Sequence, residues 1–332
     1  MDQPKFIVVV GASAGGLTAL CEFVAQLDPD LDAAYFIVLH LSRRAISSYL
    51  VHRFTECARV RCVLAKDNTP IQKGTVYVAQ PGLHLLVRKD QMVLGTGPEE
   101  NRWRPSIDVL FRSAAATYNG HTIGIVLTGL LNDGTTGMSA IKRSGGTSIV
   151  QDPNEAEYPD MPLSVLNNLE VDYCVSLSEM GRVLREIVEQ KEVQHTIVPQ
   201  DLLIESGIAE RMATGMDKTE KLGDLSPLTC PDCGGVLHEV KYDAIPRFKC
   251  HTGHSYSEDD LNHRQTENIE STLWIALRMM EERRFLLLKL ATQNQQKGFV
   301  KSAAESSERA GQLEHHINNL KEMLRINERH TA

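Results

Sequence analysis

The sequence lacks a long hydrophobic run and a surplus of positive charge. Its 332 residues include 35 Lys and Arg against 43 Asp and Glu, which gives a net charge of −8. Binding to nucleic acid usually requires clustered Lys and Arg, so we expect no nucleic-acid partner. The apolar start Phe6–Val10 is too short to span a membrane and lacks the flanks of a signal peptide. We therefore expect a cytoplasmic protein with no membrane insertion.

Cysteine is also scarce, and its distribution argues against a disulfide framework. Three of the 7 cysteines, Cys230, Cys233 and Cys250, are close in sequence, and in a reducing compartment such a cluster indicates a metal site. The other four are scattered among apolar neighbours, where buried reduced thiols are expected. They are Cys21, Cys57, Cys62 and Cys174.

Over residues 1–195, short apolar runs alternate with helical patterns. Runs of Val, Ile and Leu joined by helices predict an α/β fold, a doubly wound and mostly parallel sheet covered on both faces. The region Tyr77–Leu94 looks more like an antiparallel hairpin insert, and without it the fold would be a plain doubly wound sheet. The expected strands are Phe6–Val10, Tyr35–Leu39, Thr75–Val78, Leu83–Val87, Thr122–Leu127 and Thr147–Val150, and the expected helices include Leu17–Gln26 and Met138–Arg143.

Three shorter segments follow. Residues 196–227 predict a helix at Gln200–Ala213 and a polar linker at Gly215–Ser226, and residues 228–257 hold the cysteine cluster. Residues 258–332 predict two long helices joined by a turn at Gln293–Gly298, which form an antiparallel hairpin or a coiled-coil contact for self-association or a regulatory partner. The apolar positions are Ile269, Leu273, Leu277, Met280 and Leu287 in the first helix, and Ala310, Leu313, Ile317, Leu320 and Leu324, at heptad spacing, in the second.

A serine lies on a glycine-rich turn between the first strand and the first helix. Gly11–Gly15 reads G-x-S-x-G with Ser13 at its centre, in the strand-to-helix context that this nucleophile motif requires. No Lys follows the glycines, and the GxGxxG spacing fails at Ser13, so neither common nucleotide-binding loop is present. The turn follows the first strand, which makes an α/β-hydrolase fold unexpected. Ser13 is a candidate nucleophile at a helix N-terminus, and a packing or capping serine is the alternative.

A nucleophilic serine needs a base and a group that orients the base. His40 ends the apolar run 36–39, and Asp133 follows the run 124–127. Parallel sheets place their sites at the carboxyl ends of strands, so both side chains are expected at the same edge as Ser13. The alternatives are a strand-end histidine that caps a loop and an aspartate that forms an Asn-Asp-Gly turn.

Several motifs then carry a resemblance to a known family. They are Gly11–Gly16 with the following Leu-x-Ala-Leu, Val38–His40, Arg104–Phe111, Leu127–Met138 and Met161-Pro162. In this order they resemble the catalytic domain of CheB-type protein-glutamate methylesterases, over about residues 4–190. The resemblance implies hydrolysis of glutamyl methyl esters on methylated chemoreceptors or other sensory signalling proteins, with release of methanol. In many members it also implies deamidation of particular glutamines.

Carried over residue by residue, the resemblance makes Ser13 the nucleophile, His40 the base and then the acid, and Asp133 the orienting carboxylate. Backbone N–H groups of the Leu130 loop and of the helix start at Ala14 are expected to bind the oxyanion, and no cofactor is expected for catalysis. The chain departs from the family in having Leu130-Leu131 where Met-Gly is usual, and Ala14 where threonine is frequent. The receiver domain of typical members is missing ahead of the first strand, so we expect an open site or a different gate.

The cysteine cluster has the spacing of a zinc module. The pattern C-x₂-C-x₁₆-C-x₃-H predicts a zinc-ribbon-like fold with structural Zn²⁺ held by Cys230, Cys233, Cys250 and His254. His251 is the alternative fourth ligand, and a redox Cys-x-x-Cys is the alternative chemistry. Residues 226–332 hold 14 Lys and Arg against 15 Asp and Glu, which favours a protein contact over nucleic acid. We expect this module and the helices to regulate the esterase.

The expected function is therefore a serine methylesterase that acts on a signalling protein. One alternative is a catalytically weak signalling scaffold that uses the same fold for binding, which the changes at Leu130-Leu131 and Ala14 would permit. Another is a general hydrolase, which would cleave small soluble esters without a protein substrate.

Overall fold

The computed structural model describes residues 3–40, 47–193, 196–210 and 221–328. The chain divides into two compact units, Met1–Asp260 and Leu261–Ala332. Among the described helices, none is both long enough and apolar enough to cross a membrane.

The first unit is built around a parallel sheet of seven strands, in the order β10-β9-β8-β1-β2-β5-β3. The order predicts a switch point beside β1, because the chain continues to β2 on one side of β1 and returns later to β8 on the other side. The strands are β1 (Phe6–Ala12), β2 (Ala33–Leu39), β3 (Arg61–Leu64), β5 (Thr75–Val78), β8 (Thr122–Val126), β9 (Thr147–Gln151) and β10 (Tyr173–Val175). The doubly wound, mostly parallel α/β architecture is thus confirmed, and β3 and β10 are edge strands that the apolar runs did not reveal.

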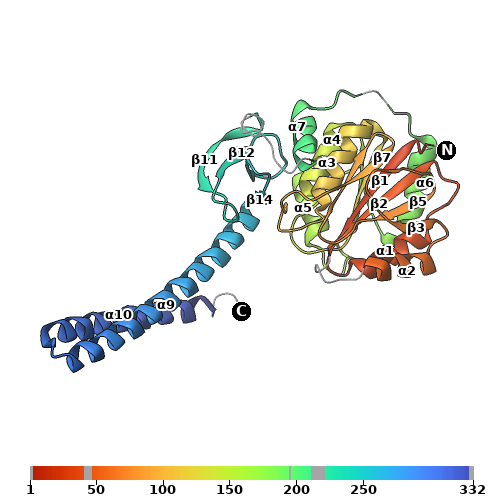
Figure 1. Cartoon of the computed structure of the whole chain (residues 1–332). Helices are drawn as coiled ribbons and strands as arrows, with labels where there is room; N and C mark the ends of the chain where they lie inside the picture. Colours follow the sequence, from red (N-terminus) through yellow and green to blue (C-terminus); the bar gives the residue numbers. More distant parts are fainter. Residues whose placement is uncertain (1–2, 41–46, 194–195, 211–220, 329–332) are drawn as a thin grey trace. The chain divides into compact units, whose positions relative to one another are not determined.

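Helices cover both faces of this sheet (Figure 1). In β1, Phe6, Val8 and Val10 face one apolar core, and Ile7 and Val9 face the other. Because both faces are covered, the strand is a continuous apolar run rather than an alternating one. The first core is filled from α1 (Gly16–Ala25), α2 (Ser47–Cys57) and α6 (Met180–Gln190), and the second from α3 (Ile107–Tyr118), α4 (Thr135–Arg143), α5 (Asp160–Asn168) and α7 (Gln200–Glu210). Two short 3₁₀ helices, η1 (Asn119–His121) and η2 (Leu177–Glu179), complete these connections.

The antiparallel insert is a separate small sheet. Its strands β4 (Thr69–Pro70), β6 (His84–Arg88) and β7 (Gln91–Gly95) pair in the order β4-β7-β6. The expected insert began at Tyr77, but Tyr77 lies in β5 of the parallel sheet and pairs with Phe36 and Val63. The antiparallel sheet therefore includes β4, which precedes Tyr77 in the chain, while Tyr77 itself belongs to the parallel sheet.

The first unit ends in a second antiparallel sheet, which we call the C-terminal sheet. Its strands, in order, are β11 (Gly223–Thr229), β12 (Val236–Val240), β13 (Arg247–Cys250) and β14 (Ser255–Ser257). Gly223 pairs with Val240, so the residues 223–226 that we expected in a linker belong to a strand. Residues 215–220 of the predicted linker, and residues 211–213 at the end of the predicted helix, lie outside the described residues.

The second unit contains two long helices, α10 (Val300–Glu328) and the larger part of α9 (Glu258–Gln296), which lie side by side (Figure 1). Ion pairs join Glu281 to Lys321 and Arg284 to Glu314, so the helices run antiparallel. Leu277, Ile317 and Leu324 are buried between them, with Leu273, Met280 and Leu320 packed alongside. Ile269 is 58% exposed and does not join this seam. The predicted turn was wrong at its start, since α9 continues to Gln296.

Candidate active site

Three strand ends meet at the switch point of the parallel sheet. Ala12 pairs with Leu39 in the register of β1 and β2, and the N–H of His40 donates to the carbonyl of Ala12 at 3.1 Å. On the other side of β1, the N–H of Ser13 donates to the carbonyl of Thr128 at 3.0 Å. The residues that follow β1, β2 and β8 therefore lie beside one another, at the edge where such sheets bind their ligands.

The turn that carries Ser13 is tight, and its neighbours fit closely. Gly15 has a φ of 71°, and the N–H of Gly16 donates to the carbonyl of Ser13 at 2.9 Å. A Cβ atom added to Gly129 would lie 2.8 Å from the Cβ of Ser13 and 2.1 Å from the sulfur of Met161. Only glycine fits there, because real Cβ atoms do not approach so closely. Gly129 thus allows the loop after β8 to pass directly beside Ser13.

The groups around Ser13 that could react or bind are not paired with one another. Among the described residues, neither the hydroxyl of Ser13 nor the backbone N–H groups of Ala14 and Leu130 make a hydrogen bond. Ala14 lies before the helix, which begins at Gly16 rather than at Ala14 as expected. Free N–H groups near a helix N-terminus favour negative charge, so this turn can bind an oxyanion.

His40 and Asp133 form a buried pair. The Nε2 atom of His40 lies 2.8 Å from Oδ2 of Asp133, and the side chains are 1% and 3% exposed. The Nδ1 atom of His40 is also buried and has no hydrogen-bond partner among the described residues. Trp103 stacks on the imidazole, with ring centroids 4.2 Å apart and an angle of 7° between the planes. One nitrogen is therefore engaged by a carboxylate, the ring plane is held by an indole, and the other nitrogen is available for proton transfer.

Asp133 is held by more than His40. Its carboxylate accepts hydrogen bonds from the N–H of Ile107 at 2.8 Å, the hydroxyl of Ser106 at 3.0 Å and the amide of Asn101 at 3.2 Å. Burial by itself would raise the pKa of Asp133, but the hydrogen bond and charge of His40 and the backbone donors lower this pKa below its ordinary value. Asp133 therefore stays ionised and can stabilise a protonated His40.

A second buried aspartate supports the loop. Oδ1 of Asp108, on α3, accepts hydrogen bonds from the N–H groups of Gly134 at 3.0 Å and Gly137 at 2.6 Å. These are N-terminal N–H groups of α4 that have no partner within that helix, so Asp108 caps α4 from outside. Oδ2 of Asp108 accepts from Thr136 at 2.6 Å and from Asn101 at 2.8 Å. Burial and the charge of Asp133 raise the pKa of Asp108 to about 7.

The sequence analysis did not identify four residues that shape this site. Asn101, Trp103 and Asp108 lie in or just before the motif Arg104–Phe111, which was noted without a role for any single residue. The hydroxyl of Thr128 lies 3.1 Å from the carbonyl oxygen of Ala14, to which it can donate, and accepts from the N–H of Tyr158 at 2.9 Å, so it ties the Tyr158 loop to the Ser13 turn. A polar residue at the end of an apolar strand was the available signal for Thr128, and an asparagine before a proline-containing motif was the signal for Asn101.

The loop after β8 exposes two leucines beside these groups. Leu130 and Leu131 are each 46% exposed, and Leu131 has a φ of 66°. That left-handed conformation suits glycine, which is the residue usual in the resembled family at this position. Leu131 thus adopts a backbone conformation that favours glycine, and the two leucine side chains are half-exposed on the loop that passes beside Ser13 at Gly129.

The predicted metal ligands come together in the C-terminal sheet. The ligand atoms of Cys230, Cys233, Cys250 and His254 all lie within 4.8 Å of one another. A tetrahedral Zn²⁺ with Zn–S bonds of about 2.3 Å and a Zn–N bond of about 2.0–2.1 Å separates two sulfurs by about 3.8 Å, and a sulfur and a nitrogen by about 3.5 Å. The Sγ atoms of Cys233 and Cys250 are 3.7 Å apart, and Cys250 Sγ is 3.5 Å from His254 Nδ1. The four residues therefore fit a tetrahedral metal, and the alternative ligand His251 is not in the group.

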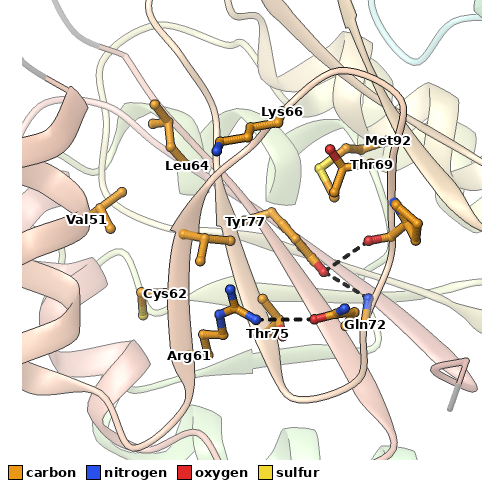
Figure 2. A pocket seen from close by; sticks show the side chains of 12 residues that line it. Val51, Arg61, Cys62, Leu64, Lys66, Thr69, Gln72, Thr75, Tyr77 and Met92 are labelled. Carbon is orange, nitrogen blue, oxygen red and sulfur yellow. Dashed lines mark hydrogen bonds between the residues drawn. The ribbon is translucent and has the colours of Figure 1, made fainter. Parts of the chain in front are cut away.

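A separate cavity of about 440 Å³ lies along the edge strand β3 (Figure 2). Arg61 and Gln72 are hydrogen-bonded at its rim, and the hydroxyl of Tyr77 accepts from the N–H of Gln72 at 2.8 Å. Burial and then the charge of Cys57 raise the pKa of the Cys62 thiol in this cavity to about 11, so it is not a nucleophile at neutral pH. None of the lining residues belongs to the groups around Ser13 or to the metal ligands.

Comparisons with known proteins agree with this arrangement. The profile of the CheB methylesterase family matches residues 8–184. A relative in Leptospira interrogans is 36% identical over 177 residues, which cover 53% of this chain and 91% of the relative. The protein-glutamate methylesterase/protein-glutamine glutaminase of Sulfurimonas denitrificans is 32% identical over 190 residues, 56% of this chain and 53% of the relative, so this chain matches about half of that protein.

A solved structure supports the same assignment. The CheB methylesterase catalytic domain of Thermotoga maritima matches with a TM-score of 0.52 and 29% identity, over 55% of this chain and 98% of that domain. The chain therefore belongs to the CheB methylesterase family, as its motifs predicted. The family match at residues 8–184 does not extend to the C-terminal sheet or to the second unit.

Proposed function

We propose that the chain is a protein-glutamate methylesterase in which Ser13 is the nucleophile, His40 the general base and Asp133 the orienting carboxylate. The supporting observation is the buried 2.8 Å hydrogen bond between His40 and Asp133, at the strand ends that flank the Ser13 turn. Residues 1–195 would be the catalytic domain. The substrate would be a methylated glutamyl side chain of a protein, as the names of the relatives suggest. The family resemblance makes that protein a chemoreceptor or a related signalling protein.

The geometry supports a two-step acyl transfer. His40 Nδ1, the nitrogen opposite the Asp133 contact, takes the proton of the Ser13 hydroxyl as its oxygen attacks the ester carbonyl. Asp133 stabilises the imidazolium. The N–H groups of Ala14 and Leu130 bind the oxyanion, and losing one such donor typically lowers turnover by about 10²–10³-fold. Methanol leaves with the proton from His40, and water, activated by the same nitrogen, hydrolyses the acyl-enzyme to glutamate.

The site favours a protein substrate over a free small ester. Leu130 and Leu131 present exposed apolar surface on the loop that passes Ser13 at Gly129. A partner helix that carries a methylated glutamate could cover these leucines, whereas a small ester would leave them in water. Burying apolar surface contributes about 25 cal/mol per Å², so such a contact would favour the macromolecular substrate.

The test is methanol release from methylated chemoreceptor cytoplasmic fragments. We expect release by the wild-type chain, none by Ser13→Ala, and unchanged release by Ser178→Ala, which removes an exposed hydroxyl from the same unit. Small soluble esters serve as the comparison substrate and should be cleaved with much lower kcat/KM. Absence of release by the folded wild-type chain would refute the esterase and favour a scaffold.

The metal site is part of the same proposal. Cys230, Cys233, Cys250 and His254 would hold structural Zn²⁺ in the C-terminal sheet, because three thiolates and an imidazole are ligands that zinc prefers. Four protein ligands leave no open position, so the metal would stabilise the sheet and take no part in ester hydrolysis. A metal content of one zinc per chain, lost in Cys250→Ser, is the expected result.

A further inference from the structure

Six charged side chains from separate segments of the first unit meet in one buried cluster, which we call the charge cluster. Three are basic side chains and three are carboxyl side chains. Each is 5% exposed or less, and Lys249 is fully enclosed. The members are Glu100 before α3, Arg112 on α3, Glu205 on α7, Asp243 after β12, and Arg247 and Lys249 on β13 of the C-terminal sheet.

The charge cluster joins the C-terminal sheet to the α/β part. Lys249 Nζ lies 2.8 Å from Oε1 of Glu100, and Arg247 Nη2 lies 2.6 Å from Oε1 of Glu205. Arg112 pairs with both glutamates from the other side. Burial opposes ionisation of Glu205, but Arg247, Arg112 and Lys249 lower its pKa to about 2. Buried, hydrogen-bonded ion pairs fix geometry because a displaced member would leave an unpaired charge out of water.

Glu100 begins the turn that contacts His40 and Asp133. The next residue, Asn101, donates its N–H to the carbonyl of Ser255 on β14 at 2.9 Å, and its side-chain amide contacts Asp133. Trp103 ends the turn and stacks on His40. Asn101 and Arg102 have φ values of 50° and 68°. Asparagine adopts this left-handed region readily, whereas arginine does so only at a cost that its surroundings must offset. The turn 100–103 is therefore anchored by the C-terminal sheet at one end and holds the His40–Asp133 pair at the other.

A second contact leads to the same pair. The side-chain amide of Asn132 donates to the hydroxyl of Ser257, the last residue of β14, at 3.2 Å. Asn132 precedes Asp133 in the chain. The C-terminal sheet therefore supports Asp133 in two ways, through the turn 100–103 and through the loop that carries Asp133.

The C-terminal sheet has little apolar core of its own. Its buried apolar side chains include Leu237, Val240, Phe248 and Tyr256, and domains below about 40 residues generally need a metal or disulfides to fold. The charge cluster lies beside the metal ligands in sequence, since Lys249 precedes Cys250. Loss of the metal would therefore release the cations that hold Glu100.

From this arrangement we infer that Lys249 and Arg247 are positioning residues for the His40–Asp133 pair, and that metal occupancy of the Cys/His site sets the turnover of the esterase through the turn 100–103. The inference rests on the proposed esterase function. Lys249 touches neither the substrate nor the reacting atoms, and it acts through Glu100, Asn101 and Trp103. A displacement of catalytic groups by about 1 Å can reduce turnover about 10²-fold, which sets the expected size of the effect.

The test uses the full chain with Trp274→Phe, so that Trp103 is the remaining tryptophan of the 2 in the sequence and its emission reports the stack on His40. Lys249→Met is compared with Lys241→Met, which removes an exposed cation paired with Asp224 on the same sheet. Turnover is measured per Ser13 site titrated with a serine-directed reagent, so that unfolded protein is not counted. Zinc is removed with a chelator and then restored.

We expect Lys249→Met to lower kcat about 10²-fold with KM within about twofold, and to change the Trp103 emission, while Lys241→Met does neither. Removing zinc from the parent should produce both changes, and adding Zn²⁺ should reverse them. Wild-type turnover and emission in a zinc-loaded Lys249→Met chain would overturn the inference. If that variant does not fold, retention of turnover and emission by the zinc-depleted parent overturns it equally. Emission that follows zinc in a parent with no esterase activity supports the coupling and refutes the proposed function alone.

Discussion

Asp133→Asn removes one charge from the buried pair and keeps the shape of the side chain. If the amide oxygen stays in the Oδ2 position, it still accepts from His40 and Ile107. The new NH₂ group then faces the hydroxyl of Ser106, which can turn to accept, and the N–H of Asp108 and the amide of Asn101, which cannot. Two donors then lack an acceptor, and each unsatisfied donor costs about 1–3 kcal/mol. We expect the free energy of unfolding to fall by about 2–6 kcal/mol, the sum for the two donors.

The same substitution should lower turnover far more than the loss of stability suggests. An amide cannot stabilise the imidazolium of His40 and favours the wrong tautomer, a change that lowers kcat by about 10⁴-fold in serine-hydrolase triads. The assay is methanol release per titrated Ser13 site, alongside urea unfolding. Asp172→Asn is the matched control, since Asp172 also accepts from a backbone N–H and a hydroxyl, of Ser148, but lies away from the site. Turnover of Asp133→Asn within tenfold of wild type, in folded protein, would refute the role of Asp133.

Three further predictions concern stability and metal binding. Burial raises the pKa of Glu205, but the neighbouring cations lower this pKa to about 2, against an ordinary 4.5. The ionised Glu205 should therefore contribute fully to stability above about pH 4.5, and this contribution should be lost as the pH falls toward 2. Urea unfolding across that range should show a slope that Glu205→Gln flattens, and an unchanged slope would contradict the ion pairing. Leu131→Gly should raise the free energy of unfolding by about 1 kcal/mol, because glycine adopts the left-handed conformation without strain. A lower free energy of unfolding would show that packing of the Leu131 side chain outweighs the backbone strain. Cys250→Ser should abolish zinc binding measured by metal analysis, whereas Cys174→Ser, at an exposed free thiol, should retain one zinc per chain, and equal zinc in both would exclude the proposed site.

Patterns that depend on neighbours in sequence were predicted well. Strand β5 occurs at Thr75–Val78 as expected, and β1, β2 and β9 differ from the predicted strands only at their ends. The continuous apolar runs identified a covered parallel sheet because burial on both faces leaves no polar position. The short strands β3 and β10 were missed because edge strands have few apolar residues, and β11 was missed because polar residues and a proline resemble a linker.

The residues of the candidate site likewise fall into those that the sequence predicted and those that only the structure could place. The grouping of His40 with Asp133 could be predicted because each follows an apolar strand, and parallel strands end at one edge of the sheet. Trp103 and Asn101 could not be placed, because their roles depend on a turn whose left-handed backbone is imposed by contacts from elsewhere. For the metal group, spacing indicated four residues and favoured His254 over His251, and the structure groups His254 with the three cysteines.

The sequence by itself determined the family, the α/β architecture, the strand-end positions of Ser13, His40 and Asp133, and the residues of the Cys/His group. These depend on local spacing and on hydrophobic periodicity, which a single chain displays directly. Only the tertiary structure decided that Lys249 is buried against Glu100, 149 residues away. A charged residue in a polar segment looks like a solvated one until its partner is known, because pairing between distant ions leaves no periodic signal in the sequence.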